Sequence, residues 1–198
     1  MRAALLAISL IAAPAFAEDI DEATIARYIG ATFGKASPEW QARMAADETI
    51  ATCNATRNRP SPAEAAAIEA RERARVVPPA DGKALGDWRE GFRVANSGLG
   101  GQFSDAPGTV NGGNCYACHQ LDPAEISYGT LGPSLTGYGK ARAYDPAAAL
   151  AAYGKIFNSQ SVLACSSMPR FGASKVLSER QIKDLVAYLF DPESPVNK

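Results

Sequence analysis

The sequence predicts an all-α protein, with a helical amino-terminal extension and helices joined by long glycine-rich loops. Apolar residues recur at helical spacing in several segments, whereas no segment shows the strict alternation of apolar and polar residues that is typical of strands. Ten glycines from residue 98 to residue 139 disfavour long regular elements in that part of the chain. No segment is repeated, which excludes a solenoid or a propeller.

The composition is that of an ordinary globular protein. The 198 residues are 46% hydrophobic and 21% charged, which argues against a disordered or fibrous chain. Lysine and arginine total 20 against 21 aspartate and glutamate residues, so the formal net charge is −1. A chain without an excess of positive charge has no basic surface to hold a phosphate backbone. Binding to nucleic acid is therefore not expected.

Residues 1–17 are predicted to be a secretory signal peptide. Arg2 precedes a run of alanine, leucine and isoleucine that closes on Ala15-Phe16-Ala17, a small-x-small triplet typical of cleavage after Ala17. An uncleaved membrane anchor is the alternative, but the run is short for a bilayer span and acidic residues follow it. We expect an exported, periplasmic protein that is not associated with the membrane after cleavage.

Residues 18–80 are expected to form the helical extension. Four apolar side chains fit one face of a first helix: Ile25, Tyr28, Ile29 and Phe33. Ser37, followed by proline, begins a second helix. Ser61 and Glu64 form a capping box that begins a further helix, which ends at the Val-Val-Pro-Pro run of residues 76–79.

Residues 81–198 are expected to form the main domain, with three further helices. The first runs from about residue 83 to residue 95, where large apolar residues recur at helical spacing. The second begins at Asp145, which proline follows, and runs to about residue 157. The last begins at Ser178, and its apolar residues form one stripe: Ile182, Leu185, Val186 and Leu189.

Cys115-Tyr116-Ala117-Cys118-His119 is the C-x-x-C-H pattern of covalent c-type haem attachment. The thiols of Cys115 and Cys118 can each form a thioether to one haem vinyl group, which holds the imidazole of His119 beneath the iron. His119 is the single histidine of the chain. The alternatives are a thioredoxin-like pair, which lacks a strand-helix-strand context, and a zinc site with Cys53 and Cys165, which lacks paired C-x-x-C knuckles. We expect one covalently attached haem c.

The second axial ligand of the iron cannot be another histidine, so methionine is the natural candidate. Met44 lies on a predicted helical face, where packing explains it. Pro169 disfavours helix at Met168, and so helps to present its thioether from an extended loop. We expect His119 and Met168 to be the iron ligands. A packing role for Met168 is the alternative, and the rival ligands are Cys165, Lys155 and Lys175.

The order of these motifs resembles class I cytochromes c over about residues 82–191. The likeness rests on the haem motif, the Leu-Gly-Pro-Ser-Leu-Thr-Gly segment of residues 131–137, the Met168 loop and the final apolar helix. It implies that the backbone carbonyl of Pro133 accepts a hydrogen bond from Nδ1 of His119. A simple turn proline is the alternative. Two protein ligands leave no coordination position for a substrate, which favours electron transfer.

A narrower resemblance covers most of the mature chain. Three segments are similar to the SoxX family, the small cytochrome subunits of SoxAX complexes in bacterial thiosulfate oxidation: residues 103–105, 112–120 and 168–172. The resemblance implies a heterodimer with SoxA, an L-cysteine S-thiosulfotransferase that couples thiosulfate to a cysteine of the SoxYZ carrier. This chain would accept the electrons and pass them to a downstream acceptor, without a catalytic residue of its own. A free-standing periplasmic electron-transfer cytochrome c is the alternative.

Two cysteines remain outside the haem motif. In an oxidising compartment Cys53 and Cys165 are expected to form a disulfide. This bond would tie the extension to the sequence just before Met168. Two free thiols are the alternative, because a sequence gives no distance between them.

Overall fold

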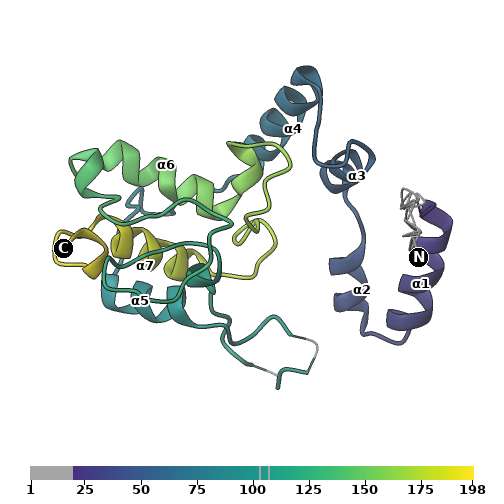
Figure 1. Ribbon diagram of the computed structural model, residues 1–198, viewed down its shortest axis with the longest axis horizontal. Coiled ribbons are helices and arrows are strands. Elements are labelled where there is room, and N and C mark those ends of the chain that lie inside the picture. Colours follow the sequence, from purple (N-terminus) through teal and green to yellow (C-terminus); the bar gives the residue numbers. More distant parts are fainter. Residues whose placement is uncertain (1–19, 103, 107) are drawn as a thin grey trace, which may run out of the picture. The chain divides into compact units, whose positions relative to one another are not determined.

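The computed structural model describes residues 20–102, 104–106 and 108–198 (Figure 1). The predicted signal peptide and its cleavage site lie outside the described residues. The described part contains α-helices and short 3-10 helices and no strand, which confirms the all-α prediction. None of these described helices has the length and apolar composition needed to cross a bilayer. The chain divides into two compact units, Met1–Ala45 and Ala46–Lys198.

Two helices form the described part of the first unit. α1 (Glu22–Phe33) begins at Asp21, whose carboxylate accepts a hydrogen bond of 2.7 Å from the backbone N–H of Thr24. α2 (Pro38–Met44) begins after Ser37 as predicted, although the Ser37 side chain makes no capping hydrogen bond. The apolar face predicted for α1 is exposed along its length: Ile25, Tyr28, Ile29 and Phe33.

The second unit opens with α3 (Glu48–Ala55) and α4 (Pro62–Ala74). α4 begins with the predicted capping box, in which the Ser61 hydroxyl accepts from the N–H of Glu64 and the Glu64 carboxylate accepts from the N–H of Ser61. α3 was not anticipated, because its cap, Asp47, has neither a following proline nor a capping box. Both helices belong to the same compact unit as the chain that follows them, so the boundary between compact units lies after Ala45, earlier than the expected domain boundary at residue 80.

α5 (Trp88–Asn96) and α7 (Glu179–Phe190) cross at close range. A Cβ built on Gly91 of α5 would lie 2.0 Å from the carbonyl oxygen of Asp184 and 2.8 Å from Cβ of Tyr188. Only glycine permits this approach. Beside it, the rings of Phe92 and Tyr188 meet edge to face, with centroids 5.8 Å apart.

The expected start of this helix at residue 83 is wrong. Residues 83–87 are not helical, and part of this segment bonds to α7 instead. The N–H of Gly86 donates to the carbonyl of Lys183 at 3.0 Å, and the N–H of Asp87 donates to the carboxylate of Asp184 at 2.8 Å. The carboxylate of Asp87 then caps α5 by accepting from the N–H of Arg89. Backbone bonds to a distant helix therefore replace the first turn.

α6 (Pro146–Phe157) matches its predicted bounds and packs beside α7 (Figure 1). The predicted cap of α7 is present, because the Ser178 hydroxyl accepts from the N–H of Gln181 and the Gln181 side chain accepts from the N–H of Ser178. The predicted stripe of α7 is buried in the main core, against α5 and α6. Four 3-10 helices complete the described structure: η1 (Cys115–Ala117), η2 (Lys140–Arg142), η3 (Ser159–Ser161) and η4 (Pro195–Asn197).

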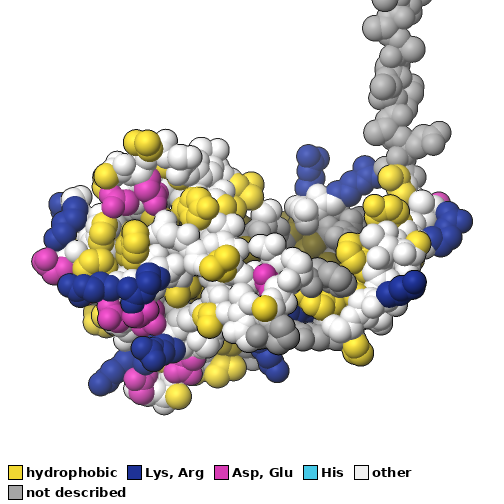
Figure 2. All heavy atoms as spheres, turned by 90° about the horizontal axis from the view of Figure 1, so that it is seen from below, with side chains coloured by type: hydrophobic (Ala, Val, Ile, Leu, Met, Phe, Trp, Pro, Cys, Tyr) yellow, Lys and Arg dark blue, Asp and Glu magenta, His cyan; other side chains and the backbone are white. Residues whose placement is uncertain are grey.

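Charges of both signs are interspersed on the surface. Figure 2 shows acidic and basic side chains next to one another on the face that it presents, rather than one extended basic patch. This mixture agrees with the formal net charge of −1 and gives no support to binding of a nucleic-acid backbone.

Candidate haem site

The C-x-x-C-H motif forms a tight turn around η1. The backbone N–H groups of Cys118 and His119 both donate to the carbonyl of Cys115, at 3.0 and 2.9 Å. Asn114, which precedes the turn, has a φ of 49°, a left-handed conformation that asparagine tolerates better than most residues. The turn therefore brings two thiols and one imidazole into a short stretch of chain.

Beside this turn lies a cavity of about 310 Å³, which is within the size range of small-ligand sites. Cys115 and His119 line it from the motif, and Met168 lines it from a distant loop. Most of the remaining wall is apolar, with contributions from Leu121, Leu135, Ile156, Phe171, Leu185 and Leu189. Burial on this wall raises the pKa of the Cys115 thiol to about 12. The cavity wall is therefore mainly apolar.

His119 is held in one orientation by the segment that follows it. Its Nδ1 lies 2.7 Å from the carbonyl oxygen of Pro133. Because a carbonyl oxygen can only accept, Nδ1 must carry the proton, which leaves the lone pair of Nε2 free to bind a metal. Gly132 packs on the ring, since a Cβ built there would lie 2.2 to 2.7 Å from three atoms of the imidazole.

Met168 is presented by a loop whose backbone is itself held. The hydroxyl of Ser159 donates to the carbonyl of Met168, and the N–H of Met168 donates to the Ser166 hydroxyl at 3.2 Å. Met44, by contrast, lies in the first unit, where it lines a separate hollow with Ile29 and Phe33. The cavity of the second unit thus has one thioether on its wall.

Two cationic side chains also line the cavity, Arg142 and Lys155. The guanidinium carbon of Arg142 lies 3.5 Å from the ring centroid of Tyr138, and its NH1 donates to the carbonyl of Tyr138 at 3.0 Å. Positive charge on an otherwise apolar wall suits a flat apolar ligand that bears carboxylates. The Cys115 thiol, the imidazole, the thioether, the apolar walls and the cations of the cavity together fit haem c, and Cys118 lies three positions further along the same turn.

Residues 103–191 match the family model described as cytochrome c. The chain contains a cytochrome c domain. A curated relative, an uncharacterized lipoprotein of Aquifex aeolicus (strain VF5), is 44% identical over 129 residues, which cover 64% of this chain and 60% of the relative. The 129 aligned residues form a longer region than residues 103–191, which match the family model. The chain spans about 60% of the length of the curated relative that it matches.

The alternative interpretations of the cysteines have less support in the structure. Within the described residues, no three histidine, cysteine, aspartate or glutamate side chains are grouped so that they could hold a metal ion. The same part of the chain contains no strand beside which a thioredoxin-like pair would lie. Cys165 is engaged in a disulfide, so it offers no thiolate as a rival ligand in the cytochrome c domain.

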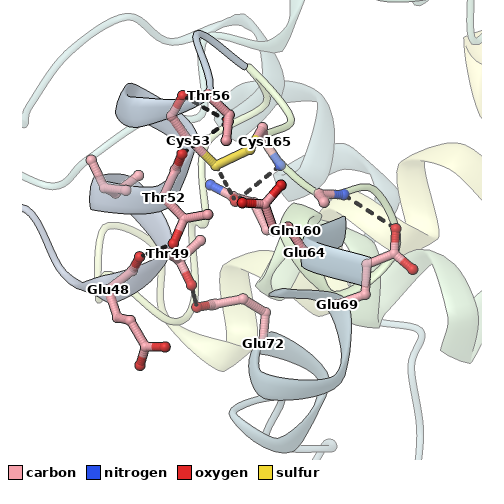
Figure 3. Close-up of a disulfide and its surroundings, with 12 residues drawn as sticks. Glu48, Thr49, Thr52, Cys53, Thr56, Glu64, Glu69, Glu72, Gln160 and Cys165 are labelled. Atoms are coloured by element: carbon pink, nitrogen blue, oxygen red, sulfur yellow. Dashed lines mark hydrogen bonds between the residues drawn. A yellow bond between two sulfur atoms is a disulfide. The ribbon is translucent and has the colours of Figure 1, made fainter. Parts of the chain in front are cut away.

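The disulfide joins Cys53 of α3 to Cys165, which lies 112 positions further along the chain (Figure 3). The two Cα atoms are 5.4 Å apart, a normal separation for a disulfide. Two backbone groups next to it are also engaged, because the N–H of Cys165 donates to Gln160 at 3.2 Å and the N–H of Ala164 donates to Glu69 of α4 at 3.3 Å. The sequence just before Met168 is therefore tied to α3 and α4.

Replacing both Cys53 and Cys165 with serine is expected to lower the free energy of unfolding of the haem-loaded protein by about 2 to 4 kcal/mol. A loop of this length corresponds to ~5 kcal/mol of chain entropy, but covalently bound haem already restricts the unfolded chain. Denaturant titration of the wild type and the double variant measures the difference. Thiol titration of denatured, unreduced holoprotein is the companion test, and two reactive thiols per chain would contradict the disulfide.

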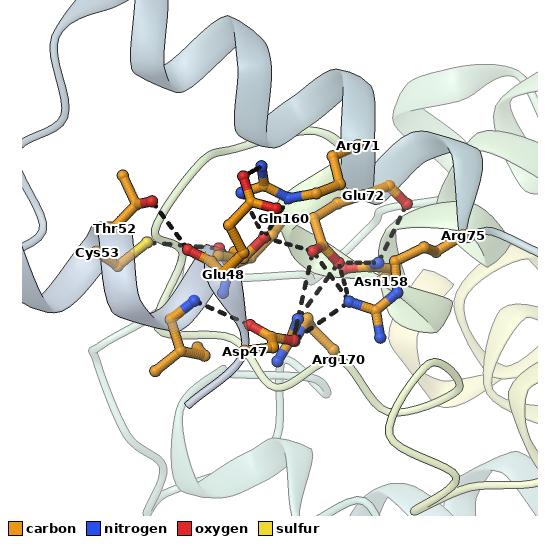
Figure 4. A network of polar contacts seen from close by, with 12 residues as sticks. Asp47, Glu48, Thr52, Cys53, Arg71, Glu72, Arg75, Asn158, Gln160 and Arg170 are labelled. Atoms are coloured by element: carbon orange, nitrogen blue, oxygen red, sulfur yellow. Dashed lines mark hydrogen bonds and ion pairs between the residues drawn. The ribbon is translucent and has the colours of Figure 1, made fainter. Parts of the chain in front are cut away.

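The sequence analysis missed a buried polar network around Glu72 (Figure 4). The side chain of Glu72 in α4 is fully buried and accepts hydrogen bonds from Thr49 at 2.6 Å and from Asn158 at 2.7 Å. NH1 of Arg170 lies 2.8 Å from the carboxylate of Asp47 and 3.3 Å from that of Glu72. The network thus joins α3, α4 and the chain on both sides of Met168.

Glu72 is ionised in this environment. Burial alone would raise the pKa of its carboxyl group, but hydrogen bonds from Asn158 and Thr49 and the charges of Arg75 and Arg170 outweigh burial and lower the pKa below the usual range. No sequence signal distinguishes Glu72 from the other glutamates of α4, since the tertiary contacts alone bury it.

Proposed function

We propose that the protein is an electron-transfer cytochrome with a single haem c attached through Cys115 and Cys118, and with His119 and Met168 as axial ligands. One observation carries the proposal. His119 and Met168 line the same apolar cavity beside the attachment turn, and Nδ1 of His119 is already engaged by Pro133. When bound, haem c supplies reversible one-electron chemistry.

Different residues of the cavity would bind the iron, surround the haem and pair with its carboxylates. Nε2 of His119 and the thioether of Met168 would both bind the iron, which would leave no position on it for a substrate. A soft thioether ligand would favour ferrous iron and raise the reduction potential. The apolar walls would keep water from the group, and Arg142 and Lys155 would supply positive charge for its carboxylates. Such a site suits electron transfer rather than bond formation.

The proposal includes export to the periplasm with cleavage after Ala17. The pattern of residues 1–17 supports it. A disulfide between Cys53 and Cys165 suits an oxidising compartment. The description of the matched relative as a lipoprotein is consistent with export as well.

The proposed partner is SoxA, with thiosulfate oxidation as the process. The support is the resemblance of residues 112–120 and 168–172 to the SoxX family, together with the closed coordination of the proposed haem. Oxidative coupling of thiosulfate to a SoxYZ cysteine would take place on SoxA. This chain would take up the electrons one at a time and deliver them to a downstream acceptor. Efficient transfer needs a short distance between haems, which favours a lasting interface.

Reconstitution tests this assignment. The holoprotein is mixed with SoxA, SoxYZ and thiosulfate, and its absorbance is followed while its association with SoxA is measured by size-exclusion chromatography. We expect a stable heterodimer and reduction of the haem of this chain, with no reduction when SoxA is omitted. A chain that neither binds SoxA nor becomes reduced would instead be a free-standing periplasmic electron shuttle.

A further inference from the structure

We propose that Glu72, which precedes the cytochrome c domain, is a positioning residue for Met168. Acting with Arg170, it holds the loop that presents the thioether to the cavity, and so determines how firmly Met168 stays in place as an iron ligand. The inference rests on the axial ligation proposed above. It gives α4, which precedes the cytochrome c domain, a role in how readily an external ligand displaces Met168 from the iron.

One connection reaches Met168 from its carboxyl side. Arg170 follows Met168 by two residues, and its side chain is only 14% exposed. Its guanidinium contacts the carboxylates of both Asp47 and Glu72 (Figure 4). Charge-assisted hydrogen bonds of this kind are stronger than neutral ones, especially where water is largely excluded. The backbone after Met168 is therefore anchored to α4 and to the cap of α3.

The second connection reaches Met168 through its backbone carbonyl group. Nδ2 of Asn158 donates to the Glu72 carboxylate at 2.7 Å and to the Glu72 carbonyl at 3.2 Å. Asn158 is directly followed by Ser159, whose hydroxyl donates to the carbonyl of Met168. Glu72 thus contacts both the residue that precedes Ser159 and the residue that follows Pro169. It is the group that the two connections share.

Loss of the Glu72 charge therefore weakens both connections together. In Glu72→Gln one of the two carboxylate oxygens becomes an amide N–H₂, which cannot accept a hydrogen bond, so Arg170 loses one of the two oxygens that it faces and either Thr49 or Asn158 loses its acceptor. Asp47 is then the remaining carboxylate contact of Arg170. The loop is then held by the packing of Met168 and Phe171 on the core and by the hydrogen bond from Ser159, so the position of Met168 is less firmly fixed. A loosened loop exchanges its thioether more readily for an external ligand.

Imidazole competition measures this effect. Imidazole is titrated into ferric holoprotein, and loss of the methionine-to-iron charge-transfer band gives its apparent dissociation constant. We expect Glu72→Gln and Arg170→Gln each to bind imidazole about tenfold more tightly than the wild type. The double variant should differ little from either single variant, because both act through the same contact. Arg170→Lys, which keeps the charge, should give a smaller change.

Arg71→Ala is the matched control. Arg71 also joins α4 to α3, through Glu48 at 2.6 Å and Thr49 at 3.0 Å. Thr49 also donates to Glu72, but the contacts of Arg71 do not involve Asn158, Arg170 or the Met168 loop. It should lower thermal stability and leave the imidazole affinity unchanged. If Glu72→Gln and Arg170→Gln lower the melting temperature but leave the imidazole affinity at the wild-type value, Glu72 is merely structural and the inference is overturned.

The same experiment separates the two proposals. If Glu72→Gln fails to fold, Arg170→Gln and Asp47→Asn carry the test, since both of those side chains are partly exposed. A wild-type protein that lacks the charge-transfer band would overturn the ligation by Met168, and this inference with it. A wild-type band combined with unchanged imidazole affinities would overturn the role of Glu72 alone.

Discussion

Replacement of Met168 with leucine is expected to abolish the methionine-to-iron charge-transfer band of the ferric holoprotein. The reduction potential should fall on the order of 100 mV, a fraction of the ≈ 0.8 V range over which axial ligands set haem potentials. Leucine is close to methionine in volume, so the cavity wall should keep its packing and the change reports on ligation. Absorbance spectra and a redox titration provide the measurements.

Met44→Leu is the control for this experiment. Met44 lies in the first unit and lines a separate hollow, so its replacement should leave both the band and the potential at wild-type values. A Met168→Leu protein that keeps its band and potential would show that another residue binds the iron. Loss of the band in Met44→Leu would then identify that residue.

Gly132→Ala is expected to damage the proximal side of the site. The added Cβ would lie 2.2 Å from Cε1 and 2.5 Å from Nδ1 of His119, so the ring must move or the segment of Pro133 must shift. Either movement breaks the 2.7 Å contact between Nδ1 and the Pro133 carbonyl. Overpacking of this kind costs about 1 to 3 kcal/mol of folding free energy. Denaturant titration should show that loss, and redox titration should show an altered potential.

Gly98→Ala provides the comparison. Gly98 is a loop glycine of the same compact unit, and a Cβ there would make ordinary contact with Asn114, at 3.6 Å or more. Its replacement should change stability by less than about 0.5 kcal/mol and leave the potential unchanged. Equal behaviour of the two variants would mean that the close approach of Gly132 to His119 has no part in holding the imidazole.

The sequence predicted the first residue of a helix correctly where a side-chain cap determines that start. The capping boxes at Ser61 and Ser178, and the Asp145 cap before proline, lie where the sequence places them. Such caps depend on residues three positions apart, and so can be read from a short window. The start of α5 and the existence of α3 could not be read in this way. Residues 86 and 87 bond to α7, almost a hundred positions further along the chain, and Asp47 caps α3 with no accompanying motif.

Some residues of the haem site could likewise be predicted from local sequence, and others could not. Cys115, Cys118 and His119 were identified from their spacing, because the chemistry of haem attachment requires those residues in one short turn. The role expected for Met168 followed from the absence of a second histidine and from its place before Pro169, whereas the role expected for Pro133 came from a resemblance. The structure places Pro133 against His119 and Met168 on the cavity wall, while the iron ligation itself stays a prediction. Glu72, Arg170 and Asn158 had no signal at all, since hydrogen bonds join them across 86 and 98 positions of sequence.

The sequence alone therefore determined the chemistry of the attachment turn, the all-α class and the capped helix starts, because these depend on residues close together in the chain. Tertiary structure decided what surrounds that chemistry. It placed Met168 and His119 in the lining of one cavity, buried the charge of Glu72 among donors from three segments, and grouped α3 and α4 with the cytochrome c domain. A buried carboxylate is stable only where its partners converge, and that convergence is a property of the folded chain.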